Sequence, residues 1–440
     1  MINILFLVYE FPPLNSGGSH RPYRFAKYLQ EFGINPIIVT PEILDAKYDN
    51  SLMAELNNIE IIRTPVDNSI KFEKILSKNY FNILDSESKK WKKHLYPILK
   101  KLVKKIDFQI MYVTAPPFSI ATLGVEVSKE FDIPLILDMR DHWSHWNITP
   151  FSSYLHYKSI LKIENSCFIH SSAVLTVSEQ MVKDFEKIHP NIDRNKYYTV
   201  RNSYDKKIIN ISNKLLLKIP SKENPIKIGY VGSFYYQPYQ RKLIFDAWWK
   251  KKPYQWFQYS PRKEDWLYRS PYFFFKTLHR FIEQYPQLSD LIKVEFIGIK
   301  YDWLITMIKE FELENYVILK GFLPHQESIS FQASCDALLI TSLKVIDGKD
   351  YCIAGKSYEY MYHQKPILAF MTEGSQKDFL KKSGISLIFE ADNIEDNVLL
   401  LKSFILGEIN FQPNQDFMKQ IHTKETTKKL VNIIKKVVAK

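Results

Sequence analysis

The sequence predicts an α/β protein built from two doubly wound domains that face each other across a cleft. Three observations predict this fold. The chain has 440 residues, enough for two domains that each bury a core. Short, fully apolar runs alternate with segments of helical periodicity, which is typical of a parallel sheet covered on both faces. The alternation stops once, in a polar stretch at 210–225, and then begins again.

The first half of the chain supplies the first domain. Phe25, Leu29 and Phe32 share one face of an expected helix at 21–32, and Gly33 is a natural stop for it. Helical patterns separate most of the expected strands. We therefore expect an N-terminal domain over 1–209 and a linker over 210–225. Apolar runs predict its strands at 4–8, 36–39, 59–63, 110–113, 134–138 and 173–177.

The second half repeats the pattern after the linker. We expect a C-terminal domain over 226–415, with a final helical segment at 416–440 that packs back on the N-terminal domain. Its strands are expected at 226–231, 294–297, 317–320, 337–340 and 366–370.

An insertion at 234–270 interrupts the second domain. Residues 234–281 hold 18 aromatic side chains and four of the eight tryptophans, with lysines interleaved at 250–252. One interpretation is a flap that contacts an acceptor or a membrane, since Trp and Tyr suit surfaces with one wet side. The other is a small self-packed subdomain. Aromatic and basic residues also fit single-stranded nucleic acid, but no nucleic-acid-binding module is recognisable, so we expect no nucleic-acid partner.

The net charge of +12 favours anionic partners. Residues 89–105 carry eight lysines and no acid, and Trp91, Leu95 and Leu102 recur there at helical spacing. Pro97 is expected to kink or divide this helix. The segment is either a basic amphipathic helix that lies on an anionic membrane surface or a surface helix docked on its own domain.

Several features bear on the compartment. No apolar run reaches about 18 residues, so no transmembrane helix is expected. The start of the chain resembles a buried strand rather than a signal peptide. Cys167, Cys335 and Cys352 lie far apart, which suggests neither a disulfide framework nor a zinc site. We expect a cytoplasmic protein, peripheral on the inner face of the membrane.

The segment 352–361, followed by K-P-I-L at 365–368, suggests a ligand site. It predicts a loop, a helix that begins near Gly355, and a buried strand. A helix start offers unpaired N–H groups and a partial positive charge, which suit a diphosphate. Glu359, about one turn further on, suits a ribose diol. The alternative is an ordinary helix start, where Glu favours the dipole and Lys356 is solvated.

Other polar or glycine-rich segments follow expected strands. They include Gly17-Gly18 in the loop after the first strand and Gly232-Ser233 after the first strand of the second domain. Glycines let backbone approach a ligand closely. Ligands of doubly wound sheets bind outside the carboxyl ends of the strands, so these segments are expected to line the cleft. T-A-P-P at 114–117 and L-D-M-R-D-H-W at 137–143 also follow strands.

These motifs together resemble the GT-B glycosyltransferases, specifically family 4 of the retaining enzymes, over nearly the whole chain. GT-B proteins have two doubly wound Rossmann-like domains facing each other across a cleft. The matching motifs are F-P-P…G-G at 11–18, D-x-R-D-x-W at 138–143, V-S-E at 177–179, N-S-Y-D at 202–205 and G-K-S-Y-E-Y at 355–360 with K-P-I-L at 365–368.

The resemblance implies transfer of a sugar, with retention, from a nucleotide-diphosphate donor to a glycan or lipid-linked glycan acceptor. It implies a role in bacterial surface polysaccharide synthesis. The departing diphosphate takes the acceptor proton, and the protein acts by placement and electrostatics. We expect no cofactor and no metal. Glu359 is assigned to the ribose, and the diphosphate to the loops Gly17-Gly18 and Gly232-Ser233 and to the helix start Gly355-Lys356-Ser357.

Asp141 with Arg140 is the candidate for positioning the acceptor or stabilising oxocarbenium character. The alternative for these two residues is a structural ion pair at a strand end. The sequence departs from the family where a first glutamate is usual, because Tyr351 stands there, with Asp350 adjacent as a partial substitute. Ser203 replaces the glycine of N-G-Y-D.

Two other classes of protein fit the same fold. One is a GT-B-like sugar-nucleotide epimerase, which would use carboxylate and histidine acid–base chemistry in the same cleft. The other is a non-catalytic, membrane-associated scaffold that has kept the fold. We expect the partners to be a nucleotide-diphosphate sugar, the acceptor, and an anionic membrane surface that meets 89–105 and the insertion.

Overall fold

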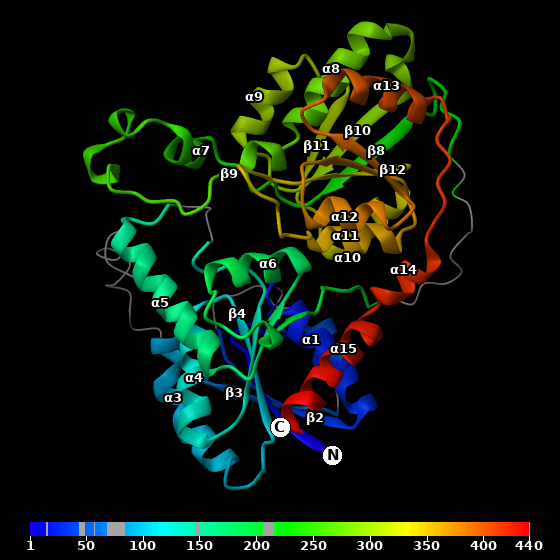
Figure 1. Cartoon of the computed structure of the whole chain (residues 1–440). Coiled ribbons are helices and arrows are strands. Elements are labelled where there is room, and N and C mark those ends of the chain that lie inside the picture. The colour runs from blue at the N-terminus through cyan, green and yellow to red at the C-terminus, as the bar shows by residue number, and fades with distance from the viewer. Residues whose placement is uncertain are drawn as a thin grey trace.

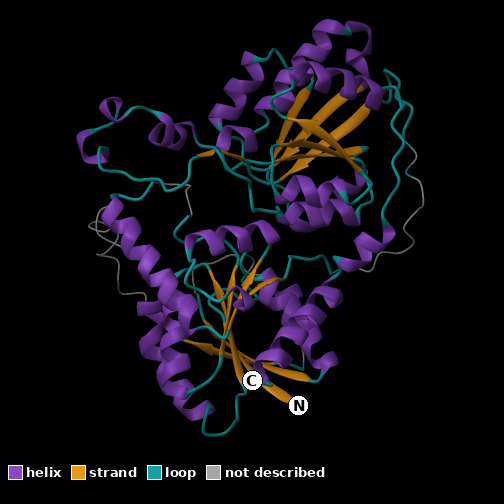
Figure 2. Ribbon diagram, viewed as in Figure 1, coloured by secondary structure: helices purple, strands orange, loops and turns teal. Residues whose placement is uncertain are grey.

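The computed structural model describes residues 1–14, 16–43, 49–56, 58–67, 84–145, 150–205, 215 and 217–439. Figure 1 shows two domains, one above the other, each with a sheet between helices. Figure 2 shows the strands of the two sheets gathered in two separate groups. The prediction of two doubly wound α/β domains is confirmed. Of the predicted linker at 210–225, residues 210–214 and 216 lie outside the described residues, and 217–225 form no helix or strand.

The N-terminal sheet has seven parallel strands in the order β3-β2-β1-β4-β5-β6-β7. Its strands are β1 (Ile2–Leu7), β2 (Ile34–Pro41), β3 (Glu60–Thr64), β4 (Ile110–Ala115), β5 (Leu135–Met139), β6 (Ala173–Thr176) and β7 (Tyr197–Thr199). Its helices are α1 (His20–Leu29), α3 (Glu87–Leu102), α4 (Ser119–Phe131), α5 (Tyr154–His170) and α6 (Glu179–Ile188). The short edge strand β7 was not predicted from the sequence.

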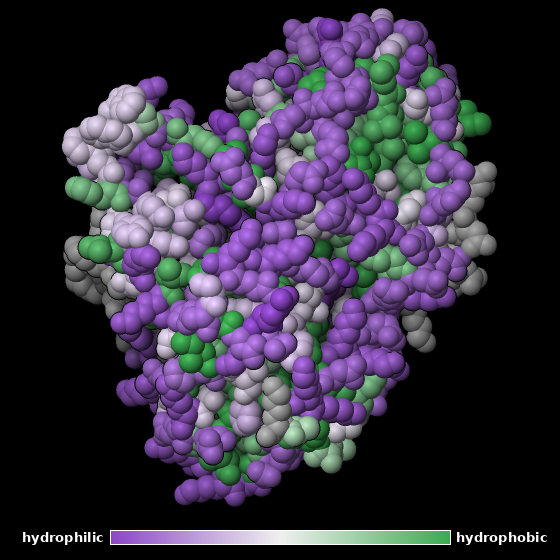
Figure 3. Space-filling view, viewed as in Figure 1, coloured by the Kyte–Doolittle hydropathy of each residue, from purple (hydrophilic) through white to green (hydrophobic). Residues whose placement is uncertain are grey.

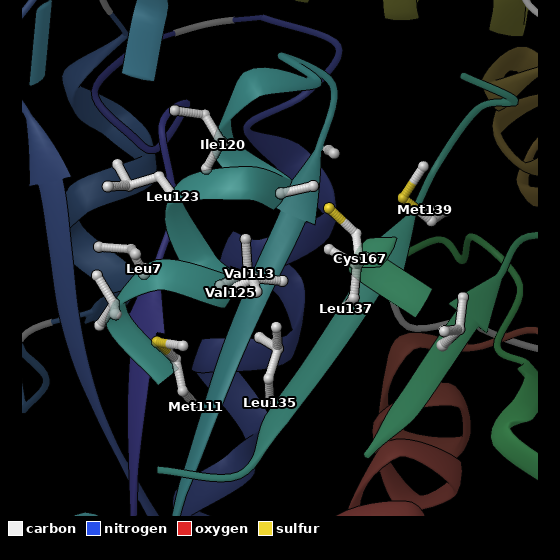
Figure 4. Close-up of a cluster of buried hydrophobic side chains, with 14 of the residues drawn as sticks. Leu7, Met111, Val113, Ile120, Leu123, Val125, Leu135, Leu137, Met139 and Cys167 are labelled. Atoms are coloured by element: carbon white, nitrogen blue, oxygen red, sulfur yellow. The ribbon is translucent and has the colours of Figure 1, made fainter. Parts of the chain in front are cut away.

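Alternate side chains of each strand enter opposite faces of this sheet. Leu5 and Leu7 of β1 join the core beneath α3, α4 and α5, whereas Ile4 and Phe6 join the core beneath α1. Figure 4 shows the first of these cores, in which labelled side chains of β1, β4 and β5 meet Ile120, Leu123 and Val125 of α4 and Cys167 of α5.

The helix α3 is continuous through Pro97, so the proline does not divide it. Trp91, Leu95, Leu99 and Leu102 are buried in the N-terminal core. The apolar stripe of this lysine-rich helix therefore packs on its own domain, which is the second of the two interpretations given for 89–105.

The C-terminal sheet has six parallel strands in the order β11-β10-β8-β12-β14-β15. Its strands are β8 (Ile226–Val231), β10 (Ile292–Ile297), β11 (Val317–Gly321), β12 (Ala337–Thr341), β14 (Ile367–Met371) and β15 (Ser386–Glu390). Its helices are α8 (Tyr272–Gln284), α9 (Asp302–Glu310), α10 (His325–Ser334), α11 (Gly355–Tyr362), α12 (Ser375–Lys381) and α13 (Ile394–Ile405).

The chain then returns to the N-terminal domain through α14 (Gln415–Gln420) and α15 (Thr423–Val438). α15 contacts α1, as Figure 1 shows. Leu430, Val431 and Ile434 of α15 are buried in the same core as β1. The end of the chain thus completes one face of the first sheet.

The insertion contains α7 (Pro238–Phe245) and β9 (Glu264–Asp265), which pairs antiparallel with β13 (Lys344–Val345). Its far side reaches the N-terminal domain: Phe151 and Tyr259 exchange two backbone hydrogen bonds of 2.9 Å. Arg262 also lies 3.4 Å from Asp184 of α6. The insertion therefore bridges the two domains.

Among the described residues, no helix is both long and apolar enough to cross a membrane.

Candidate functional site

The topology places one site at the carboxyl ends of both sheets. Strand order reverses between β1 and β4 in the first sheet and between β8 and β12 in the second. A crevice forms between two neighbouring strands whose following connections run to opposite faces of the sheet. The loop after β12 meets the loop after β5, because Tyr351 contacts Asp141. The two crevices therefore face one another.

Lys356 lies at the start of α11, beside the loop that follows β8. Its Nζ lies 3.8 Å from the centre of the Tyr230 ring. A Cβ atom at Gly232 would lie 3.2 Å from the same Nζ, and Gly232 has a φ of +115°, which disfavours other residues. The sequence-predicted residues Gly232, Gly355 and Lys356 are thus brought together, and Gly355 has no neighbour within 4 Å of an added Cβ.

Arg269 is a functional candidate that sequence reasoning missed. It ends the turn Trp266–Arg269, just before α8, and its guanidinium lies 5.4 Å from the centre of the Tyr235 ring. Arg269 Nη1 also lies 3.8 Å from Cys352 Sγ, in the loop that leads into α11. Burial, with a smaller contribution from the charge of Arg269, lowers the pKa of Lys356 to about 7. Arg269 therefore lies near the start of α11. The one sequence signal was an arginine directly before a Ser-Pro helix start.

The other predicted donor residues occupy different environments. Ser233 accepts a hydrogen bond from Tyr230 Oη over 3.1 Å. Ser357 is buried, and its N–H donates to Ala354 O over 2.9 Å. Its amide is consequently occupied within the turn, which leaves the first residues of α11 as the exposed part of the helix start.

Glu359 lies one turn into α11 with an exposed side chain. Burial lowers the pKa of Arg24 in α1, and the charge of Glu359 opposes that shift. The electrostatic effect of Glu359 therefore extends to a residue of the N-terminal domain.

On the N-terminal side, Gly18 packs against a charged pair. A Cβ atom at Gly18 would lie 1.5 Å from Glu10 Oε2 and 2.3 Å from Arg140 Nη1, so a larger residue would displace these two charged groups. Arg140 Nη2 lies 3.5 Å from Glu10 Oε2 and also donates to Pro116 O. Gly17 is exposed and has no neighbour within 4 Å of an added Cβ. The glycine loop and Arg140 thus form one unit.

Arg140 retains unused hydrogen-bonding capacity. Its buried Nε and Nη1 atoms have no hydrogen-bond partner among the described residues. Buried donors are normally paired, so these two atoms are suited to a ligand oxygen.

Asp138 has a structural place. It is fully buried, and Arg21 of α1 contacts both of its oxygens, at 2.7 and 2.9 Å. Burial lowers the pKa of Arg21, but the charge of Asp138 and its hydrogen bonding with Arg21 together contribute to a net rise of the pKa. This ion pair joins α1 to the end of β5.

Asp141 lies at the contact between the domains. Tyr351 Oη donates to Asp141 Oδ1 over 3.1 Å. Burial raises the pKa of Asp141, while Arg140 and the bond from Tyr351 oppose that shift. The Tyr351 ring also meets the His142 ring edge to face at 4.2 Å. His142 Nε2 lies 3.2 Å from Asp184 Oδ2.

Asp350 does not stand in for a sugar-facing glutamate in this arrangement. It is 2% exposed, and its Oδ1 accepts the N–H of Cys352 over 2.9 Å. Burial raises the pKa of Asp350 to about 7, although Arg269 opposes the shift. This carboxyl group holds the loop that carries Tyr351 and is turned away from solvent.

A cavity of about 890 Å³ lies beyond this contact, between α6, the insertion and the loop after β13. It is lined on one side by Asp184 and Lys183 and on the other by Arg262 and Lys349. Within the part of the chain that the structure describes, no group of three or more His, Cys, Asp or Glu side chains is arranged to hold a metal ion.

The fold is similar to that of solved nucleotide-sugar enzymes. No protein-family model matches the sequence, and no curated protein matches it. HepE of Anabaena, solved in complex with UDP, is 13% identical with a TM-score of 0.58, over 99% of this chain and 100% of that one. The lipopolysaccharide outer core galactosyltransferase WaaB is 14% identical with a TM-score of 0.59, over 99% of both chains.

A UDP-GlcNAc 2-epimerase from Methanocaldococcus jannaschii is also similar, at 10% identity with a TM-score of 0.51, over 99% of both chains. Fold similarity therefore includes two kinds of enzyme. The chain has the GT-B fold of two Rossmann-like domains.

Proposed function

We propose that this protein is a glycosyltransferase that takes a sugar from a nucleotide-diphosphate donor, with retention at the anomeric carbon, as in family 4. One observation carries the proposal. The two basic side chains Lys356 and Arg269 lie beside the start of α11, at the point where strand order reverses, with Arg269 Nη1 3.8 Å from Cys352 Sγ in the loop that leads into this helix. A bound diphosphate would favour the protonated form of Lys356, whose pKa burial and Arg269 lower to about 7, and would attract both side chains.

The opposite half of the cleft supports the proposal. Gly17, Gly18 and Arg140 form a second unit, in which the buried Nε and Nη1 atoms of Arg140 have no hydrogen-bond partner among the described residues. Glu359 supplies a carboxylate one turn from Lys356, where a nucleoside ribose would lie next to a diphosphate. In HepE, a protein of the same fold, UDP is bound.

We assign the steps as follows. Lys356, Arg269 and the amides at Ser233 and Gly355 bind the diphosphate and stabilise it as it leaves, whereas the N–H of Gly232 is already donated to Ile297 O over 2.8 Å. The departing phosphate oxygen accepts the proton of the acceptor hydroxyl on the face where the new bond forms. Asp141, held by Tyr351 and flanked by Arg140, positions the acceptor. Because protein cations supply the positive charge, we expect turnover in the presence of EDTA.

We propose a glycan or lipid-linked glycan of a bacterial surface polysaccharide as the acceptor. The support is the basic charge of the chain and the exposed aromatic surface of its insertion. WaaB, with a similar fold, is a lipopolysaccharide galactosyltransferase.

The test is a thermal-shift panel of UDP-, GDP- and ADP-sugars. A donor that binds the folded state at 100 times its Kd stabilises it by about 2.7 kcal/mol. We expect one nucleotide series to raise the Tm of the wild type, and to raise the Tm of Lys356→Ala by less at the same concentration. If no nucleotide sugar changes the Tm, the chain is a scaffold and the proposal is wrong.

An epimerase is the second candidate, favoured by the cluster of Asp141, His142 and Tyr351 in the cleft. These are groups suited to acid–base chemistry. The stabilising nucleotide sugar, incubated without acceptor, separates the two functions. An epimerase converts it to its epimer, whereas a transferase leaves its sugar configuration unchanged.

A further inference from the structure

The end of the insertion presents aromatic side chains to solvent. Trp249 is 67% exposed and Phe257 is 78% exposed, with Trp248, Tyr254 and Trp256 also exposed nearby. Figure 3 shows this end protruding at the upper left, with pale and green residues gathered on it. A cluster of exposed large apolar side chains is typical of a surface that binds a protein partner, a ligand or a membrane.

The exposure belongs to a folded unit. The Trp248 ring packs edge to face on Trp249 and on Trp256, with ring centres 5.9 and 5.5 Å apart. Gln255 is only 5% exposed, and its side chain bonds to Tyr239 Oη and to the N–H of Lys252. In residues 248–257, which we call the lobe, a polar side chain is therefore buried and aromatic side chains are exposed. This is the reverse of the usual pattern of burial.

The lobe is also basic. Residues 242–258 contain four lysines and one acid. Lys250 and Lys252 are exposed among the aromatic rings, and the Lys252 ammonium lies 6.0 Å from the centre of the Tyr254 ring. Trp and Tyr side chains are enriched at the headgroup level of membranes, and lysines are attracted to anionic headgroups.

The start of α5 extends this surface into the N-terminal domain. Tyr154 is exposed and its ring packs on Tyr259 of the insertion at 5.0 Å. Leu155 next to it is 75% exposed, and Lys158 follows on the same exposed side. Figure 1 shows the insertion reaching across to this end of α5. Both domains therefore contribute to one aromatic and basic surface.

We propose that this surface, formed by 248–257 and the start of α5, docks the protein on an anionic lipid bilayer. The lysines favour an anionic partner over a neutral one, and the exposed rings favour one with an apolar interior over a soluble polyanion. The helix α3 has lysines but no exposed apolar stripe, because its apolar side chains are buried. The inference does not depend on what the cleft binds.

The test is co-sedimentation of the full chain with vesicles. We expect binding to vesicles of phosphatidylglycerol and phosphatidylcholine, and much weaker binding to phosphatidylcholine alone. Lys250→Ala with Lys252→Ala removes two charges, each worth about fivefold in affinity near an anionic surface, so we expect an about 25-fold loss. Trp249→Ser with Phe257→Ser should lose at least about tenfold through lost apolar burial.

Matched controls separate this surface from the rest of the chain. Lys104→Ala with Lys105→Ala makes the same charge change on the α3 segment, and Phe322→Ser removes a 72% exposed ring elsewhere. Both controls should bind vesicles as the wild type does. The proposal is overturned if no vesicle binds or if the α3 variant loses as much binding. It is also overturned if the aromatic variant binds normally but changes from dimer to monomer by light scattering, since the surface would then join two copies.

Discussion

Tyr351 of the C-terminal domain donates a hydrogen bond from Oη to Asp141 Oδ1 of the N-terminal domain, over 3.1 Å. The two residues are 210 positions apart in the sequence. The bond joins the loop after β13 to the loop after β5, and thus joins the proposed donor half of the cleft to the proposed acceptor half. A tyrosine therefore connects the domains at the position where the motif that the sequence resembles has a glutamate.

Replacing Tyr351 with Phe should change the pH dependence of turnover. The variant keeps the ring against His142 but leaves Asp141 without its hydrogen bond, which costs about 1–3 kcal/mol for a buried acceptor. The bond now lowers the pKa of Asp141. We expect the acid limb of the kcat profile to move to higher pH. The control Tyr316→Phe, at a half-buried tyrosine before β11, should keep the wild-type profile. An unchanged profile in Tyr351→Phe would remove Asp141 from the mechanism.

Donor affinity should fall as pH rises above about 7. Lys356 has a pKa of about 7 in the free protein, because of burial and Arg269, and a bound diphosphate would keep it protonated. Binding then takes up a proton, so Kd rises by up to about tenfold per pH unit above that pKa and is independent of Lys356 below it. Calorimetry with the nucleotide sugar in buffers of different ionisation enthalpy measures the uptake.

The matched variant for that experiment is Lys356→Arg, whose side chain stays charged throughout this range. Its affinity should not fall between pH 7 and 9. If wild type and variant show the same slope, the titrating group is another residue.

Glu359→Ala should weaken donor binding through the ribose. Loss of a charge-assisted hydrogen bond costs about 1.5–3 kcal/mol, or about 10- to 150-fold in Kd. The wild type should also prefer a ribonucleotide to its 2′-deoxy analogue, and the variant should lose that preference. Wild-type donor affinity in Glu359→Ala would contradict the assignment of this carboxylate to the ribose.

Arg21→Met should destabilise the N-terminal domain, because it leaves Asp138 buried and unpaired. Breaking a buried pair costs about 3–5 kcal/mol. The exposed pair Lys92–Glu126, with a distance of 2.8 Å, is the control, and Lys92→Ala should cost less than about 1 kcal/mol. Urea unfolding of the two variants measures both. Equal stability of the two would show that Arg21 and Asp138 are not a stabilising pair.

The central strands were predictable because they are apolar on both faces. β8 runs from Ile226 to Val231, as the sequence predicts, and α1 is followed by a left-handed Gly33 with a φ of +77°. The edge strand β15 was missed because its apolar run is only three residues long, Leu387 to Phe389, between the polar residues Ser386 and Glu390. Periodicity does not distinguish so short a run from part of a helix.

The sequence predicted only those parts of the candidate site that depend on residues adjacent in the chain. The residues around them are sufficient to predict the glycine turns at 232 and 355 and the helix start at Lys356. Arg269 and the Tyr351–Asp141 bond were not predictable, because tertiary packing brings them together. Position 351 was noticed as a departure, but nothing local to it shows that its hydroxyl crosses to the other domain.

The most direct test of the account is calorimetric titration of the nucleoside diphosphate that best stabilises the protein, into wild type, Lys356→Ala and Lys349→Ala. Lys349 is an exposed lysine on the rim of the neighbouring cavity. The account predicts that Lys356→Ala weakens binding by about 10- to 150-fold, the value of a charged hydrogen bond, while Lys349→Ala binds as the wild type does. Wild-type affinity in Lys356→Ala would contradict a diphosphate site at the start of α11.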